Sequence, residues 1–111
     1  MTGNDYQKYA MVTSNKALTT DMHLLNGVMG MCGEAGECVD MVKKHMMQGH
    51  DLDKEHLAKE IGDVLWYVAE ATNALGFNLD EIMRMNIDKL KARYPEGFEV
   101  NRSVNRQSGD V

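Results

Sequence analysis

The amino-acid sequence predicts an all-α protein built as a four-helix bundle. The chain has 111 residues with a single proline and no run of alternating β-branched residues that would indicate a strand. Its apolar residues recur at helical spacing between recognisable helix start and stop signals. The length suits one domain. We expect residues 1–98 to form that domain and residues 99–111 to form a polar, flexible tail.

Capping signals predict the first two helices. A short helix is expected to begin at a cap on Asn4 or Asp5 and to run to about Thr13. A long helix should follow over residues 21–47. It should end at Gly49, because glycine most readily takes the left-handed conformation at a helix C-terminus.

The long helix contains four glycines at every third position, from residue 27 to residue 36. Each glycine costs a helix about 1 kcal/mol relative to alanine, so a compensating contact is expected. Small residues let a neighbouring backbone or a ligand come close. The four are Gly27, Gly30, Gly33 and Gly36.

The third and fourth helices have the clearest start signals. Asp53 is a good N-cap for a helix that continues to the residue before Gly76. Asn78, followed three residues later by Glu81, has the pattern of a capping box. The fourth helix should end where Pro95 forbids its continuation. Because the connections are short, we expect antiparallel neighbours.

Composition and charge exclude several classes of function. The formal net charge is -5 and the cationic residues are spread along the chain, so a nucleic-acid polymer is not expected as a partner. No segment approaches the roughly 18 apolar residues of a membrane helix, and no secretion signal is recognisable. We therefore expect a cytoplasmic protein with no membrane partner. Cys32 and Cys38 are too far apart on one helix for a disulfide, and we expect buried, reduced thiols.

Two pairs of acidic residues stand out within apolar segments. Glu34 and Glu37 are the only acidic residues within positions 22–39, and their spacing of three places both on one helix face. Glu60 and Asp63 repeat this spacing on the third helix. In an antiparallel hairpin, both pairs would lie at similar heights, because each is a similar distance from the intervening turn. We expect the four carboxylates to converge.

Four converging carboxylates need cations or protons, since they would otherwise repel one another. Hard oxygen ligands favour Mg²⁺, for which Mn²⁺ can substitute, and Mg²⁺ commonly retains phosphate oxygens in its shell. The alternative is a set of exposed acids neutralised by Lys43, Lys44 or Lys59. We favour the metal because two matched pairs occur on neighbouring helices.

The ordered motifs resemble a known family. GEAGE, followed after 22 residues by EIGD, is similar to the ExxE and ExxD signature of the MazG-like nucleoside triphosphate pyrophosphohydrolases. NIDKLKARYPEGF resembles the fourth helix of that family, and the resemblance spans residues 26–98. It implies Mg²⁺-dependent cleavage between the α and β phosphates of a (d)NTP. The products would be a (d)NMP and pyrophosphate, with nucleotide-pool house-cleaning as a role.

The resemblance also implies which residues act. Glu34, Glu37, Glu60 and Asp63 would hold the metal, and a metal-bound water would be the nucleophile. Glu34 and Glu37 are the catalytic candidates, with Glu37 accepting the proton of the water.

We expect substrate contacts from the fourth helix and from the one tryptophan. Asn86, Lys89 and Arg93 share one stripe of that helix. Arg93 can bind phosphate through two hydrogen bonds and Lys89 as a point charge, with a solvated helix face as the alternative. Trp66 either stacks on a nucleobase or packs at a subunit interface.

Several residues are weaker candidates. His23 and Asn26 would contact a base edge, and Asp40 would add a metal ligand or be an exposed acid. In the tail, Arg102 and Arg106 would close over substrate if the tail is ordered. Three histidines near the turn are expected to be solvated: His45, His50 and His56.

A long helix that is apolar almost all round leaves surface that one copy cannot bury. We therefore expect a homodimer or homotetramer that completes the bundle, as the resemblance also implies. A phosphoribosyl-ATP pyrophosphatase-like enzyme is the nearest alternative. A non-catalytic helical module and a ferritin-like metal bundle are others. The ferritin-like bundle needs Glu-x-x-His pairs, which the four acidic residues do not form.

Overall fold

The computed structural model describes all 111 residues, and its only regular elements are helices. Five helices follow one another along the chain: α1 (Gly3–Met11), α2 (Thr20–Gln48), α3 (Lys54–Ala74), α4 (Leu79–Arg93) and α5 (Val100–Val104). The all-α prediction is confirmed. None of the helices combines the length and the apolar composition that crossing a membrane requires.

The first helix begins earlier than predicted. Thr2 is its N-cap: the Thr2 hydroxyl accepts a hydrogen bond from the Asp5 N–H at 3.0 Å, and the Asp5 carboxylate accepts one from the Thr2 N–H at 3.2 Å. The predicted caps, Asn4 and Asp5, are therefore wrong, because this capping box starts at Thr2. The helix also ends at Met11, before Thr13, whose N–H bonds to a carbonyl only three residues back.

The other predicted helix ends agree closely with the structure. Gly49 ends α2 in the left-handed region, with φ 74°. The Asp53 carboxylate caps α3 by accepting a hydrogen bond from the His56 N–H at 3.0 Å. Asn78 and Glu81 form the predicted capping box of α4. These ends were predictable because each depends on residues within one helical turn.

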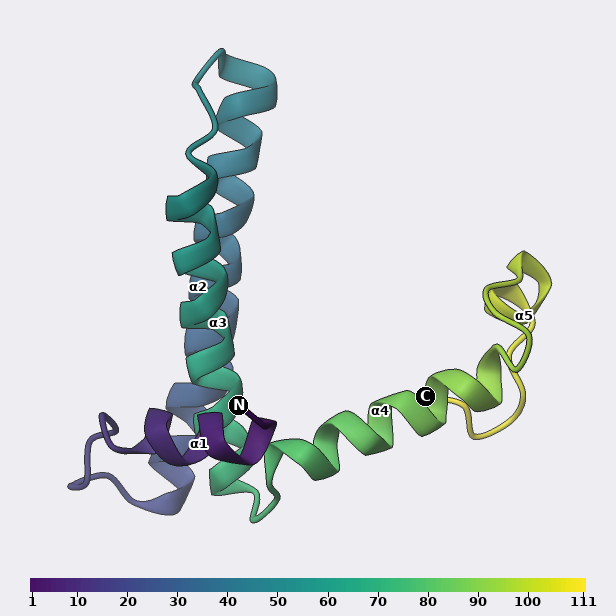
Figure 1. Ribbon diagram of the computed structural model, residues 1–111, viewed down its shortest axis with the longest axis horizontal. Helices are drawn as coiled ribbons and strands as arrows, with labels where there is room; N and C mark the ends of the chain where they lie inside the picture. The colour runs from purple at the N-terminus through teal and green to yellow at the C-terminus, as the bar shows by residue number, and fades with distance from the viewer.

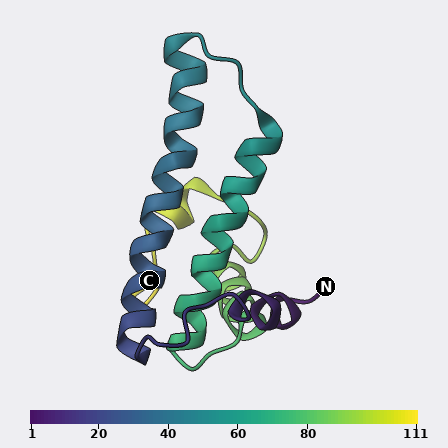
Figure 2. The same cartoon turned by 90° about the vertical axis from the view of Figure 1, so that its left-hand side faces the viewer.

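The helices α2 and α3 form a long antiparallel hairpin, with α1 across its base (Figure 1). Figure 2 shows the two hairpin helices side by side from a second direction. From the base, α4 leads away from the hairpin and carries α5 and the tail at its far end (Figure 1). One chain therefore does not close a four-helix bundle. Leu79 anchors the start of α4, whereas Met83 and Ile87 further along it stay exposed.

The buried core lies at the base of the hairpin, where α1 meets α3 and α4. The cluster of buried apolar residues there consists of Ala10, Ala69 and Leu79. The Trp66 indole N–H donates to the Ala10 carbonyl at 3.1 Å and to the Thr13 hydroxyl at 2.9 Å. Trp66 thus packs against α1 of its own chain, which fixes the orientation of its ring.

Much apolar surface is left uncovered in one copy. Only 8 of 111 residues are buried, and the radius of gyration is 17.0 Å, against about 13 Å for a compact chain of this length. Ile61 of α3 is 56% exposed. Leu25 of α2 is 60% exposed. Cys32 and Cys38 are free thiols, but the prediction that they are buried is wrong, because Cys32 is exposed and Cys38 is only half-buried.

Two of the four glycines in α2 meet α3 closely. A Cβ at Gly27 would lie 2.8 Å from the backbone nitrogen of Ala71, and one at Gly30 would overlap the ring of Tyr67. At Gly33 and Gly36, a Cβ would meet nothing within 4 Å. Close approach explains the first two glycines, and the other two leave open space beside the acidic residues.

Candidate functional site

Three carboxylates from the two hairpin helices meet. Glu34 and Glu37 of α2 and Glu60 of α3 each offer an oxygen, and these oxygens all lie within 4.8 Å of one another. Antiparallel pairing across the turn brings the two motifs to the same height. We call these three residues the acidic cluster.

Glu34 and Glu60 of the acidic cluster affect each other's protonation. A hydrogen bond with Glu60 raises the pKa of Glu34 to about 7, and desolvation and the neighbouring acidic charges act in the same direction. The same hydrogen bond, with contacts from Glu37 and His56, lowers the pKa of Glu60. Near neutral pH the two carboxylates therefore share a proton that a cation can displace.

One oxygen of Glu60 lacks a donor. The Oε1 atom contacts His56 Nε2 at 3.1 Å, whereas the buried Oε2 atom has no hydrogen-bond partner. A buried carboxylate oxygen without a partner is unfavourable, so either the shared proton or a cation should satisfy it. The three carboxylates, one of which has this unpaired oxygen, are hard donors that fit Mg²⁺ or Mn²⁺.

Asp63 lies next to the acidic cluster rather than within it. Its oxygens are not among those that lie within 4.8 Å of one another, but its charge contributes to the raised pKa of Glu34. A cavity of about 320 Å³ is lined by four residues: Glu34, Asp63, Trp66 and Tyr67. The rings of Trp66 and Tyr67 meet edge to face, with centroids 5.1 Å apart. We call this space the aromatic cavity.

A second hollow adjoins the acidic cluster. Its volume is about 440 Å³, and its lining includes Glu37, Glu60 and His56 together with the open positions Gly33 and Gly36. His56, which was expected to be solvated, is mostly exposed, but its Nε2 atom also contacts Glu60. The acidic cluster thus borders two hollows, one beside Glu34 and one beside Glu37 and Glu60.

The lysines named as alternative partners of the acids are paired elsewhere. Lys44 and Lys43 contact Asp40 at 2.8 and 3.5 Å, and the hydrogen bond with Lys44 lowers the pKa of Asp40. Lys59 contacts Glu55 at 3.6 Å. Asp40 is therefore a half-buried acid that is paired with two lysines. No lysine or arginine forms an ion pair with the acidic cluster or with Asp63.

The candidate phosphate-binding residues lie away from the acidic cluster of the same chain. Asn86 and Lys89 are exposed on α4, which leads away from the hairpin (Figure 1). Arg93, at the end of α4, donates two hydrogen bonds to Asp110 of the tail. The structure therefore does not bring Asn86, Lys89 and Arg93 to the acidic cluster within one chain. The tail predicted to be flexible also contains α5; its mobility stays a prediction.

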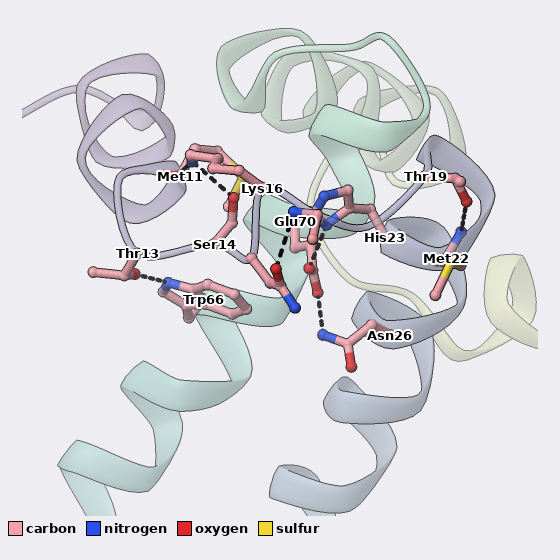
Figure 3. A network of polar contacts seen from close by, with 12 residues as sticks. Met11, Thr13, Ser14, Lys16, Thr19, Met22, His23, Asn26, Trp66 and Glu70 are labelled. Atoms are coloured by element: carbon pink, nitrogen blue, oxygen red, sulfur yellow. Dashed lines mark hydrogen bonds and ion pairs between the residues drawn. The ribbon is translucent and has the colours of Figure 1, made fainter.

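A buried carboxylate that was not predicted from the sequence connects α3 to α2 at the base of the hairpin. Glu70 of α3 is 1% exposed; it accepts a hydrogen bond from Asn26 Nδ2 at 2.7 Å and contacts His23 Nδ1 at 2.8 Å (Figure 3). His23 and Asn26, considered for a base edge, are thus used within the chain. One signal for Glu70 was available, since it follows Asp63 by two helical turns on the same face.

Comparison with known proteins identifies a family. The family model described as the MazG nucleotide pyrophosphohydrolase domain matches residues 25–98. Gene 37 protein of Mycobacterium phage L5 is 35% identical over 82 residues, which cover 70% of this chain and 72% of that relative. No solved structure matches the chain. The matched range includes the acidic cluster, Asp63 and α4, and ends before the tail.

Proposed function

The chain belongs to the MazG nucleotide pyrophosphohydrolase family, and from this premise we propose that it is a Mg²⁺-dependent enzyme that hydrolyses (d)NTPs to (d)NMPs and pyrophosphate. We place this activity in the cytoplasm, on the nucleotide pool. The observation that carries the proposal is the acidic cluster with its unpaired Glu60 Oε2. Such a set of donors suits a divalent cation, which a polyphosphate chain also binds.

The acidic residues have distinct roles in this proposal. Glu34, Glu37 and Glu60 would hold the cation, with Asp63 beside them as a further ligand. A cation bound there would neutralise phosphate charge and acidify a bound water. Glu37 is the exposed member of the cluster, so it can reach a water that enters from solvent. We therefore keep Glu37 as the proton acceptor and Glu34 as the second catalytic candidate.

The aromatic cavity supports a place for the nucleobase. It adjoins Glu34, so a base held there would leave its phosphates close to the acidic cluster. The indole N–H of Trp66 is occupied by α1, so Trp66 would contact a base through its ring face rather than through a hydrogen bond. Tyr67 lines the same cavity and is a second aromatic candidate.

The proposal includes assembly into a homodimer or homotetramer. The uncovered apolar residues of the hairpin and of α4 support it, because burying them needs a second copy. Assembly would also let Asn86, Lys89 and Arg93 of one copy reach the acidic cluster of another. Phosphate contacts from α4 would then offset the repulsion between an anionic substrate and the acids.

Pyrophosphate release from a nucleotide panel tests the proposed activity. The panel should hold canonical and damaged (d)NTPs and phosphoribosyl-ATP, each with and without Mg²⁺. Glu37→Gln and Glu60→Gln should lower kcat/KM by at least about 100-fold. Glu55→Gln is the matched control, because Glu55 lies on α3 outside the cluster and should keep wild-type activity. Wild-type turnover by a folded Glu60→Gln variant would refute the site.

A further inference from the structure

The tail holds the side chain of Arg93 in a two-point contact. Arg93 Nε donates to Asp110 Oδ2 at 2.8 Å, and Arg93 Nη2 donates to Asp110 Oδ1 at 2.7 Å. The two side chains are only 10% and 15% exposed. This paired geometry is the one that a guanidinium group uses for carboxylates and for phosphates alike.

A turn in the tail directs Asp110 back toward α4. Gly109 has φ 86°, a conformation that glycine takes without strain, and the Asp110 N–H bonds to the Gln107 carbonyl at 3.1 Å. The turn reverses the chain, so that a residue 17 positions after Arg93 meets its guanidinium. The contact is therefore supported by the backbone as well as by charge.

The surroundings of this contact are cationic. A cavity of about 330 Å³ lies beside it, lined by Lys89, Arg93 and Arg102 from the helices and by residues of the tail. The hydrogen bond with Arg93 lowers the pKa of Asp110, and the charges of Arg106 and Lys89 act in the same direction. Arg93 pairs with Asp110, and Arg102 contacts Glu99 at 3.8 Å, so Lys89 is the cation of this lining that has no ion-pair partner. This cavity can therefore accept an anion that carries more negative charge than the Asp110 carboxylate.

We propose that Lys89, Arg93 and Arg102 form a polyphosphate-binding site, and that Asp110 occupies it as a built-in competitor until a nucleotide displaces it. The proposal rests on the proposed function, which assigns phosphate binding to Lys89 and Arg93. One guanidinium fork cannot pair with Asp110 and a phosphate group at the same time. A phosphate group that binds to the Nε–Nη2 edge of Arg93 therefore requires the tail to release that edge, and the apparent affinity for polyphosphate is reduced by the fraction of chains in which the tail is docked.

Titration with sodium tripolyphosphate in EDTA tests this competition without any catalytic step. Asp110→Asn should bind the probe about fivefold more tightly than the wild type, because its tail competes less. Asp51→Asn removes the same charge from the hairpin turn and should bind as the wild type does. In an Arg93→Gln background, Asp110→Asn should not change the affinity for tripolyphosphate. Equal affinities of wild type and Asp110→Asn would overturn the proposal.

Steady-state kinetics separate this proposal from the proposed function. With a nucleotide that the wild type hydrolyses, Asp110→Asn should lower KM and leave kcat unchanged. If both proteins hydrolyse the nucleotide but Asp110→Asn changes neither KM nor the affinity for tripolyphosphate, the competition is refuted and the proposed hydrolase activity is not. Tighter tripolyphosphate binding by Asp110→Asn, with no hydrolysis by either protein, would support the anion site and refute the hydrolase.

Discussion

At the scale of single residues, the proton shared by Glu34 and Glu60 has a measurable consequence. The pKa of Glu34 is about 7 in the folded chain, against an ordinary value of 4.5. The folded state thus binds this proton more tightly than the unfolded state does. The stabilisation is fully present below pH 4.5 and is lost as the pH rises toward 7. The lowered pKa of Glu60 acts in the opposite sense, but only below its ordinary value of 4.5.

We therefore predict that the contribution of Glu34 to the free energy of unfolding falls between about pH 5 and pH 7 in EDTA. Urea denaturation of the wild type and of Glu34→Gln, followed by circular dichroism, measures that contribution as the difference between the two proteins. Glu34→Gln cannot ionise and should lack this part of the pH dependence. A difference that stays constant or reverses over this range would contradict the shared proton.

Some site residues were predictable from the sequence and others were not. The meeting of Glu34, Glu37 and Glu60 was predictable, because spacing within a helix and distance from a turn set their heights, whereas Asp63 lies beside them instead of among them. The partner of Arg93 was not, since Asp110 reaches it only through a turn at Gly109 that no helical pattern indicates. Glu70 was missed because its partners, His23 and Asn26, lie on the other hairpin helix.

At the scale of the elements, the packing of α2 on α3 depends on the glycines that face α3. Gly27→Ala should destabilise the fold by about 1 to 3 kcal/mol, because its Cβ would meet the backbone of Ala71. Gly33→Ala is the matched control on the same helix. It has open space and should stabilise the fold by up to about 1 kcal/mol through helix propensity. Thermal unfolding measures both; equal stabilisation by the two changes would contradict the close packing.

The helix ends were predictable, whereas the direction of α4 was not. A cap such as Asn78 with Glu81 needs only neighbouring residues, so the sequence contains all that determines it. The direction of α4 depends on which apolar surface its remaining residues contact. In one chain only Leu79 of α4 is buried, and Met83 and Ile87 stay 48% and 47% exposed. One chain therefore leaves the bundle open, and its completion by further copies stays a prediction.

At the scale of the whole molecule, the exposed apolar surface predicts self-association. Sedimentation velocity should show a species of two or four times the chain mass of 12.5 kDa. Leu25→Glu and Leu65→Glu place a charge on exposed apolar positions of the hairpin and should shift the protein toward smaller species. Val104→Glu, at an exposed position of α5, should not. A wild type that sediments as one chain would contradict the assembly.

The binding of Mn²⁺ tests the central claim most directly, because it needs neither a substrate nor turnover. Electron paramagnetic resonance of free Mn²⁺ during a titration gives the affinity of the wild type, Glu60→Gln and Glu55→Gln. We predict saturable binding by the wild type and by Glu55→Gln, and a loss of at least about tenfold in Glu60→Gln. A folded Glu60→Gln variant that binds Mn²⁺ as tightly as the wild type would contradict a metal site built on Glu34, Glu37 and Glu60.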